Sequence, residues 1–172
     1  MAWDEETRQL QARAALMRRL EPEFPDLSDV ALQANVQEWL APYLAGCTRL
    51  AEAGKLDLMA ILRDRLGHAH AARLERDLPS HLNLPGGRAQ IDYTQPEPVA
   101  SARAQAFYGM RETPKLAGGR LPLKLALLSP AQRPIAITGD IGGFWKNGWA
   151  DARKDMRGRY PKHHWPEDGG AG

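Results

Sequence analysis

Apolar residues recur at helical spacing through the first half of the chain. Between residues 5 and 20, Leu10, Ala14 and Met17 share one side of a predicted helix, and acidic residues stand at its start, where the helix dipole favours negative charge. A second helix is predicted to begin after Ser28, a suitable N-cap. Its apolar face is formed by residues at the same spacing: Leu32, Val36, Trp39, Leu40 and Tyr43. These stripes predict helices that each bury one face in a core.

A third helix is predicted to begin at Asp57 and to bury Ile61. Gly67 is expected to interrupt it before Leu74 resumes the apolar face, because glycine is a poor residue for a helix interior. Residues 1–79 are therefore predicted to form a helical subdomain.

Short extended segments replace the helical stripes in the second half. Residues 81–84 and 88–93 flank a Pro-Gly-Gly turn, which predicts a β-hairpin. Residues 121–128 and 133–138 repeat this pattern around a slightly longer loop, which predicts a second hairpin.

Three short helices are expected around these hairpins, at residues 101–109, 140–147 and 149–157. The overall prediction is an α+β fold. An N-terminal helical bundle in residues 1–79 precedes, in residues 80–172, a small antiparallel sheet or partly open barrel with short C-terminal helices.

The composition is typical of soluble globular proteins. Of 172 residues, 43% are hydrophobic and 26% are charged. No apolar run approaches the roughly 18 residues that cross a bilayer, and the N-terminus is acidic where a signal peptide would be basic. We therefore expect a cytoplasmic protein with no membrane partner. The single cysteine, Cys47, cannot form an internal disulfide and is expected to be a small buried hydrophobe.

No catalytic motif is visible in the sequence. The Gly-Lys pair at 54–55 lacks the upstream glycine and the following Ser or Thr of a P-loop. The glycine pairs at 86–87 and 118–119 are interpreted as backbone turns, because neither opens a helix after a strand. His68 and His70 are two residues apart and point in different directions on a helix. We predict no catalytic residue, cofactor site or metal site in this chain.

Positive charge is concentrated toward the C-terminus. Residues 1–80 carry 10 Lys and Arg against 13 Asp and Glu, whereas residues 81–172 carry 13 against 8. Between 146 and 164, six Lys or Arg and two Asp are interleaved with aromatic residues. Lysine and arginine release counterions from phosphates, and bases stack on exposed aromatic rings. The candidate nucleic-acid-binding residues are Lys146, Arg153, Lys154, Arg157, Arg159, Tyr160, Lys162, His163 and Trp165.

Trp145, Trp149 and Trp165 have two interpretations that the sequence leaves open. In the first, the rings cap the small sheet, because tryptophans are mostly buried in folded proteins. In the second, the rings stack on bases of single-stranded RNA. Replacing Trp165 lowers stability in the first case and weakens RNA binding in the second.

The same C-terminal stretch resembles the closing signature of HrpB-type ATP-dependent helicases. Arg157–His163 and Trp165–Asp168 carry the resemblance, with His164 where the family usually has proline. Other blocks match in the same order: Pro25–Ser28, Trp39–Pro42, Ser80–Pro85, Thr113-Pro114, Gly118–Pro122, Leu127–Ala131 and Phe144-Trp145. Several blocks in the right order are more specific than any single short motif.

The resemblance implies a superfamily 2, DEAH-box-like helicase that uses ATP and magnesium on RNA. This chain contains neither a P-loop nor an Asp-Glu-x-His box, so it is similar to the C-terminal accessory region, and helicase motor domains in cis are its expected partner. Whether the chain takes part in an enzyme's chemistry is left open. The expected role is to assist the motor by binding RNA or packing on the motor. The alternative is a protein interaction or scaffolding module that makes no nucleic-acid contact.

Overall fold

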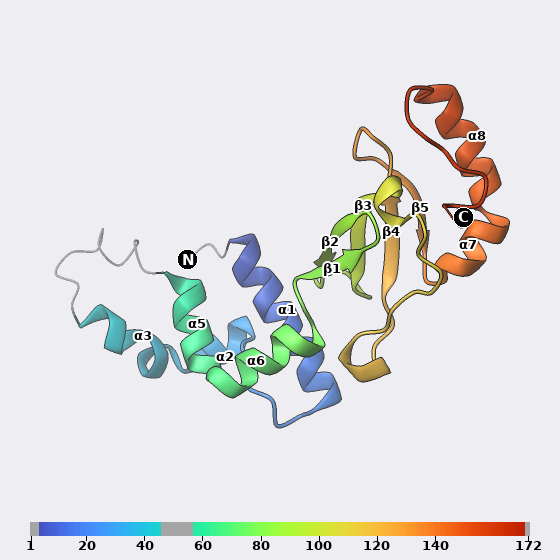
Figure 1. Ribbon diagram of the computed structural model, residues 1–172. Helices are drawn as coiled ribbons and strands as arrows, with labels where there is room; N and C mark the ends of the chain where they lie inside the picture. The colour runs from blue at the N-terminus through green and yellow to red at the C-terminus, as the bar shows by residue number, and fades with distance from the viewer. Residues whose placement is uncertain (1–3, 46–56, 171–172) are drawn as a thin grey trace. The chain divides into compact units, whose positions relative to one another are not determined.

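The computed structural model describes residues 4–45 and 57–170 and divides into two compact units, Met1–Leu78 and Pro79–Gly172. Within the described residues, the first unit contains only helices, and the second contains a five-stranded sheet followed by two α-helices (Figure 1). This arrangement confirms the α+β class. No helix in the described part of the chain is long and apolar enough to cross a membrane. Cys47 lies outside the described residues.

Side-chain caps fix the starts of three helices in the first unit. Asp4, Ser28 and Asp57 each accept a hydrogen bond from the backbone N–H three residues later, at 2.8, 3.3 and 3.1 Å respectively. The starts predicted after Ser28 and at Asp57 are therefore confirmed. The described helices of this unit are α1 (Glu5–Leu20), α2 (Asp29–Ala34), α3 (Val36–Leu44), α5 (Leu58–Leu66) and α6 (His68–Asp77).

The second predicted helix is divided into α2 and α3. The backbone leaves helical geometry at Asn35, where φ is −115° and ψ is 23°, and its side-chain amide donates to the carbonyl four residues earlier at 3.0 Å. Asparagine competes with the helical hydrogen bonds in this way. Across the break, Trp39 Nε1 donates to Leu32 O at 2.8 Å, and both side chains are buried. Val36 and Tyr43, also predicted on this face, are exposed.

Gly67 separates α5 from α6, as the sequence predicts. Its φ of +87° lies in the left-handed region that favours glycine. Leu62, Leu66 and Leu74 on either side of it are at most 2% exposed. The turn therefore allows two short helices to contribute to one core.

Among the described residues of the first unit, Arg13 is the one charged side chain that is buried, with 4% exposed. Its Nε donates to Leu78 O at 2.7 Å, and its Nη2 pairs with Glu75 at 3.1 Å. Burying an unpaired charge is strongly unfavourable, so these partners are needed. They connect α1 to α6 and to the residue that follows it.

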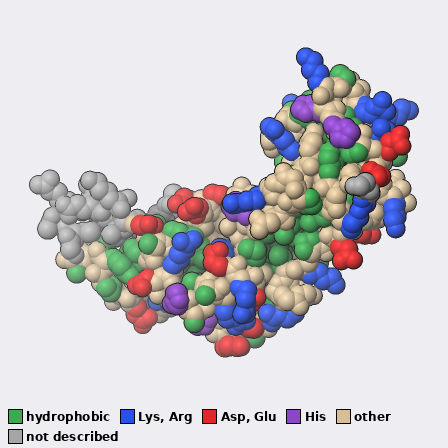
Figure 2. Space-filling model, in the orientation of Figure 1, with side chains coloured by type: hydrophobic (Ala, Val, Ile, Leu, Met, Phe, Trp, Pro, Cys, Tyr) green, Lys and Arg blue, Asp and Glu red, His purple; other side chains and the backbone are tan. Residues whose placement is uncertain are grey.

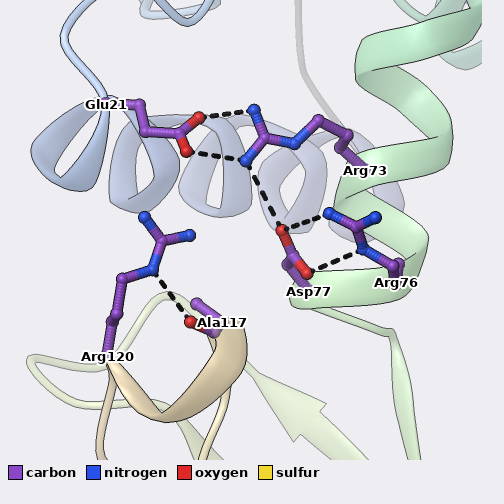
Figure 3. Close-up of polar contacts among 6 residues, drawn as sticks. All are labelled: Glu21, Arg73, Arg76, Asp77, Ala117 and Arg120. Carbon is purple, nitrogen blue, oxygen red and sulfur yellow. Dashed lines mark hydrogen bonds and ion pairs between the residues drawn. The ribbon is translucent and has the colours of Figure 1, made fainter.

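A second polar network joins the same two helices nearer the surface (Figure 3). Arg73 donates two hydrogen bonds to the Glu21 carboxylate, at 2.6 and 2.7 Å. Asp77 lies 3.6 Å from Arg73 and 3.1 Å from Arg76. The hydrogen bonds that Arg73 donates to Glu21 raise the pKa of Arg73. Because Arg73 is about a third exposed, water screens the pairs, and the network mainly orients α6 against the end of α1.

The second unit is built on a mixed sheet whose spatial order follows the sequence. Its strands are β1 (His81–Leu84), β2 (Gly87–Asp92), β3 (Val99–Arg103), β4 (Lys124–Leu128) and β5 (Pro134–Thr138). The β1–β2 and β4–β5 pairs are the two predicted hairpins, and both are confirmed. β3 and β4 run parallel, so the sheet is mixed rather than purely antiparallel. β1 and β5 form its two edges, and the sheet is not closed.

β3 corrects the helix predicted at 101–109. Residues 101–103 are extended, and only Ala104–Phe107 form a helical turn, the 3-10 helix η1. The segment Val99–Arg103 contains two alanines and a serine, which carry little strand propensity. Pairing on both edges, with β2 and β4, determines its conformation.

Both glycine pairs lie at backbone turns, as interpreted from the sequence: Gly86 is in the β1–β2 turn, and Gly87 begins β2. A Cβ at Gly86 would lie 2.9 Å from Gln105 O, so the hairpin turn approaches η1 too closely for a larger residue. The second pair belongs to the 3-10 helix η2 (Ala117–Gly119). Two hydrogen bonds between Leu116 and Leu121, at 2.9 and 3.1 Å, close this turn.

Candidate nucleic-acid interface

All nine candidate residues lie on the last two helices and the segment after them. α7 (Ile141–Asn147) begins after Asp140, whose carboxylate caps it, and α8 (Trp149–Arg159) follows. These are the two helices predicted there. We define the tail as residues 160–168. Lys146 lies on α7; Arg153, Lys154, Arg157 and Arg159 lie on α8; and Tyr160, Lys162, His163 and Trp165 lie on the tail.

The three tryptophans of this region are buried. Trp145 is 6% exposed, Trp149 0% and Trp165 5%. The ring centroids of Trp145 and Trp149 are 5.1 Å apart in a T-shaped arrangement, and those of Trp149 and Trp165 are 6.3 Å apart. Such pairs add to the free energy gained by burial. The rings therefore form a core, and their burial supports the structural interpretation over base stacking.

Three side-chain hydrogen bonds position the tail: two are donated by α8, and one lies within the tail. The Trp149 indole donates to Pro166 O at 2.7 Å, and the Trp165 indole donates to Tyr160 O at 2.9 Å. Arg153 Nε donates to Trp165 O at 2.7 Å. The candidate Arg153 thus has a structural role as well as a charge. These contacts fix the backbone that carries the exposed basic side chains.

Tyr108, which follows η1, fixes the tail from its other side. Its hydroxyl donates to His164 O at 2.9 Å, and its ring lies 5.9 Å from that of Trp149. Burial raises the pKa of Tyr108 well above its usual range, so the hydroxyl stays protonated as a donor.

Five cationic candidates are exposed to solvent, and we call them the basic surface: Lys146, Lys154, Arg157, Arg159 and Lys162. Arg159 pairs with Asp155 at 3.3 Å, but the side chains are 67% and 56% exposed, so the pair is weak. No ion pair or hydrogen bond joins the other four side chains to a described residue. In Figure 2, Lys, Arg and His side chains gather over α8 and the tail.

Two aromatic candidates keep accessible surface. His163 is exposed and Tyr160 is half-buried, and their ring centroids are 6.3 Å apart. These rings, rather than the indoles, are available to a base.

A cavity of about 520 Å³ opens beside the tail, and Arg153, Arg157, His163 and Trp165 contribute to its lining. The other five candidates do not line it. His164 does, although it is absent from the predicted set. Two features of the sequence point to His164: it lies next to His163 in a basic stretch, and it stands where the resembled family usually has proline.

Comparison with known proteins places the chain among helicase C-terminal regions. The family model for "ATP-dependent helicase C-terminal" matches residues 39–169. The chain is 41% identical over 170 residues to the ATP-dependent RNA helicase HrpB of Escherichia coli K12, covering 96% of this chain and 21% of that protein.

Two solved structures agree with this match. The crystal structure of E. coli DExH-box NTPase HrpB superposes with a TM-score of 0.89 at 38% identity, covering 99% of this chain and 22% of that one. The crystal structure of Escherichia coli DEAH/RHA helicase HrpB superposes with a TM-score of 0.77 at 37% identity, covering 96% of this chain and 21% of that one. The chain thus spans about a fifth of the length of these relatives.

Proposed function

This chain belongs to the family of HrpB-type ATP-dependent helicase C-terminal domains, and on that premise we propose that it assists a helicase motor in cis by binding single-stranded RNA through its basic surface. In this proposal, ATP and magnesium act in motor domains outside these 172 residues, and the protein works in the cytoplasm. The chain itself contributes no catalytic group. Its role is to contact phosphates of the bound RNA strand with exposed Lys and Arg side chains.

The observation that carries the proposal is the exposure of the basic surface on a fixed backbone. Four of its five side chains have no partner among the described residues, and the fifth has a weak one. Cations that are not paired within the protein release counterions from phosphates without first breaking an ion pair. The resulting binding is weak, sensitive to salt and largely independent of sequence.

Fluorescence anisotropy with a labelled single-stranded RNA decamer at low salt tests the proposal. Lys154→Ala/Lys162→Ala removes two members of the basic surface that do not line the cavity. We expect the affinity to fall about three- to tenfold, because exposed charge contacts contribute up to about 1 kcal/mol each. Arg111→Ala/Lys115→Ala removes two exposed cations elsewhere in the second unit and should leave the affinity unchanged.

Two results would overturn the proposal. The wild-type chain would fail to bind RNA at low salt, or both double variants would lose affinity equally. Equal losses would show that only the net charge of the chain matters.

One observation favours protein packing as a second candidate function. Val30 is 78% exposed, Val36 40% and Leu44 37%, and they lie on the consecutive helices α2 and α3. Apolar side chains exposed on neighbouring helices are typical of surfaces that contact another domain. If this function holds, Val30→Glu/Val36→Glu abolishes binding to a separately purified motor portion and leaves RNA affinity unchanged. Unchanged binding to the motor portion would exclude this function for α2 and α3.

A further inference from the structure

We call the cavity beside the tail the tail cavity, and guanidinium and imidazole groups contribute to its lining. Its polar lining includes two guanidinium groups, from Arg153 and Arg157, and two imidazoles, from His163 and His164. Glu167 is the one carboxylate among the described lining residues. The volume of about 520 Å³ lies in the range of small-molecule sites. Of the basic surface, only Arg157 lines this cavity, so most of that surface lies outside it.

The two arginines of the lining come from one helix. They are four residues apart on α8, so their side chains lie on the same helix face one turn apart. The hydrogen bond from Arg153 Nε to Trp165 O orients that guanidinium, and its other N–H groups have no partner among the described residues. Arginine N–H groups in a fixed fork match the geometry of phosphate oxygens.

Two hydrogen bonds position the part of the tail that carries His163 and His164. The Trp165 indole bonds to Tyr160 O at 2.9 Å, and the Tyr108 hydroxyl bonds to His164 O at 2.9 Å. The His163 ring lies 6.2 Å from the Trp165 ring, centroid to centroid, and its side chain is exposed. Nucleobases stack on imidazole rings as they do on other aromatic side chains.

We infer that the tail cavity binds one phosphate-bearing nucleotide. The phosphate lies between Arg153 and Arg157, and the base lies against His163. Glu167 disfavours a second phosphate in the cavity and is an acceptor for a ribose hydroxyl. This inference rests on the proposed function where the nucleotide belongs to an RNA strand, and it names the place where one nucleotide of that strand is held. A 5′-terminal and an internal nucleotide share this chemistry.

Histidine modification with diethyl pyrocarbonate, mapped by mass spectrometry on the 172-residue chain, tests the inference. The probes are adenosine 5′-monophosphate, a 5′-phosphorylated RNA decamer and the same decamer with a 5′-hydroxyl. Each bound probe should protect His163 and His164, which are exposed in the absence of ligand. His68, exposed on α6 in the first unit, is the internal control and should react at an unchanged rate.

Arg157→Ala supplies the matched variant, because Arg157 is exposed and has no described partner, so its removal should not affect folding. Affinity for the mononucleotide should fall about tenfold, as expected for loss of a hydrogen bond to a charged group. Arg157→Lys keeps the charge but lacks the forked N–H groups. Its affinity for the mononucleotide should therefore lie between those of the wild type and Arg157→Ala. Thermal melting of each variant confirms that the fold is retained.

The outcomes separate this inference from the proposed function. Stronger protection by the 5′-phosphorylated decamer than by the 5′-hydroxyl one identifies a strand end as the ligand, and equal protection identifies an internal nucleotide. If RNA binds while His163 and His164 stay as reactive as in the free protein, the inference is wrong and the proposed function stands. If the mononucleotide protects them but no RNA affinity is measurable, the proposed function fails and the cavity assignment stands. No protection by any probe overturns the inference.

Discussion

Arg13 is a charged residue whose position in the core gives it a structural role. Arg13→Met keeps an apolar stem of similar length but leaves Leu78 O without its donor at 2.7 Å. We expect the free energy of unfolding of the first unit to fall by about 1–3 kcal/mol, the cost of leaving a buried polar group unsatisfied. Urea denaturation followed by circular dichroism measures the change.

Arg8→Met is the matched control, because Arg8 is half-exposed and its nearest acid, Asp29, is 3.8 Å away. Its effect should stay within about 0.5 kcal/mol, as for most surface substitutions. Equal losses in the two variants would show that the buried hydrogen bond contributes nothing specific.

The Asp4 cap should make the stability of the first helix depend on pH. The backbone N–H of Thr7 donates to its carboxylate and lowers the pKa of Asp4 below the ordinary value. A group with a lowered folded-state pKa contributes stability above its unfolded pKa, and this contribution is lost as the pH falls through the folded pKa. The wild-type chain should therefore lose melting temperature below about pH 4.

Asp4→Asn keeps a capping oxygen without the titration. Its melting temperature should fall less than that of the wild type between pH 5 and pH 2.5, in parallel thermal melts followed by circular dichroism. Parallel pH curves for the two proteins would show that the cap is not coupled to protonation.

At the scale of elements, the ends of the helices and the two hairpins could be predicted because local interactions determine them. Ser28 and Asp57 cap helices through the N–H groups three residues later, and the first hairpin turns at a Pro-Gly-Gly sequence. The strand β3 could not be predicted, because small residues carry little strand propensity and its partner β4 lies far along the chain. The break at Asn35 was also missed, because the apolar spacing continues across it.

The packing of the C-terminal segment against α7 gives a prediction at the same scale. Gly169 has a φ of +65°, and a Cβ at that position would lie 2.3 Å from the Trp145 ring. Gly169→Ala should therefore destabilise the second unit by about 1–3 kcal/mol, through overpacking and backbone strain. Tryptophan fluorescence during urea unfolding reports on this directly, because the indoles form the core involved.

Gly158→Ala is the matched control for that substitution. Gly158 lies within α8, and nothing lies within 4 Å of a Cβ placed there. Alanine is favoured over glycine in a helix by about 1 kcal/mol, so this variant should be at least as stable as the wild type. Loss of stability in both variants would contradict the packing of Gly169 on Trp145.

In the molecule as a whole, the sequence indicates which region of the fold carries the positive charge, but it does not indicate which side chains are exposed. The excess of Lys and Arg after residue 80 points to the C-terminal helices, where the exposed basic surface lies. It does not reveal that Trp165 is 5% exposed, because burial of an indole depends on rings brought together by the fold. It also does not reveal that Arg153 is held by a carbonyl of the tail.

The salt dependence of RNA affinity shows whether the basic surface contacts phosphates. Anisotropy titrations across a series of salt concentrations give the slope of log K against log salt for each variant. The slope of Lys154→Ala/Lys162→Ala should be smaller in magnitude than the wild-type slope by about 1.4, or about 0.7 for each lost contact on a single strand, and that of Arg111→Ala/Lys115→Ala should not change. Identical slopes for all three proteins, or a wild-type affinity that does not respond to salt, would show that the basic surface does not contact phosphates.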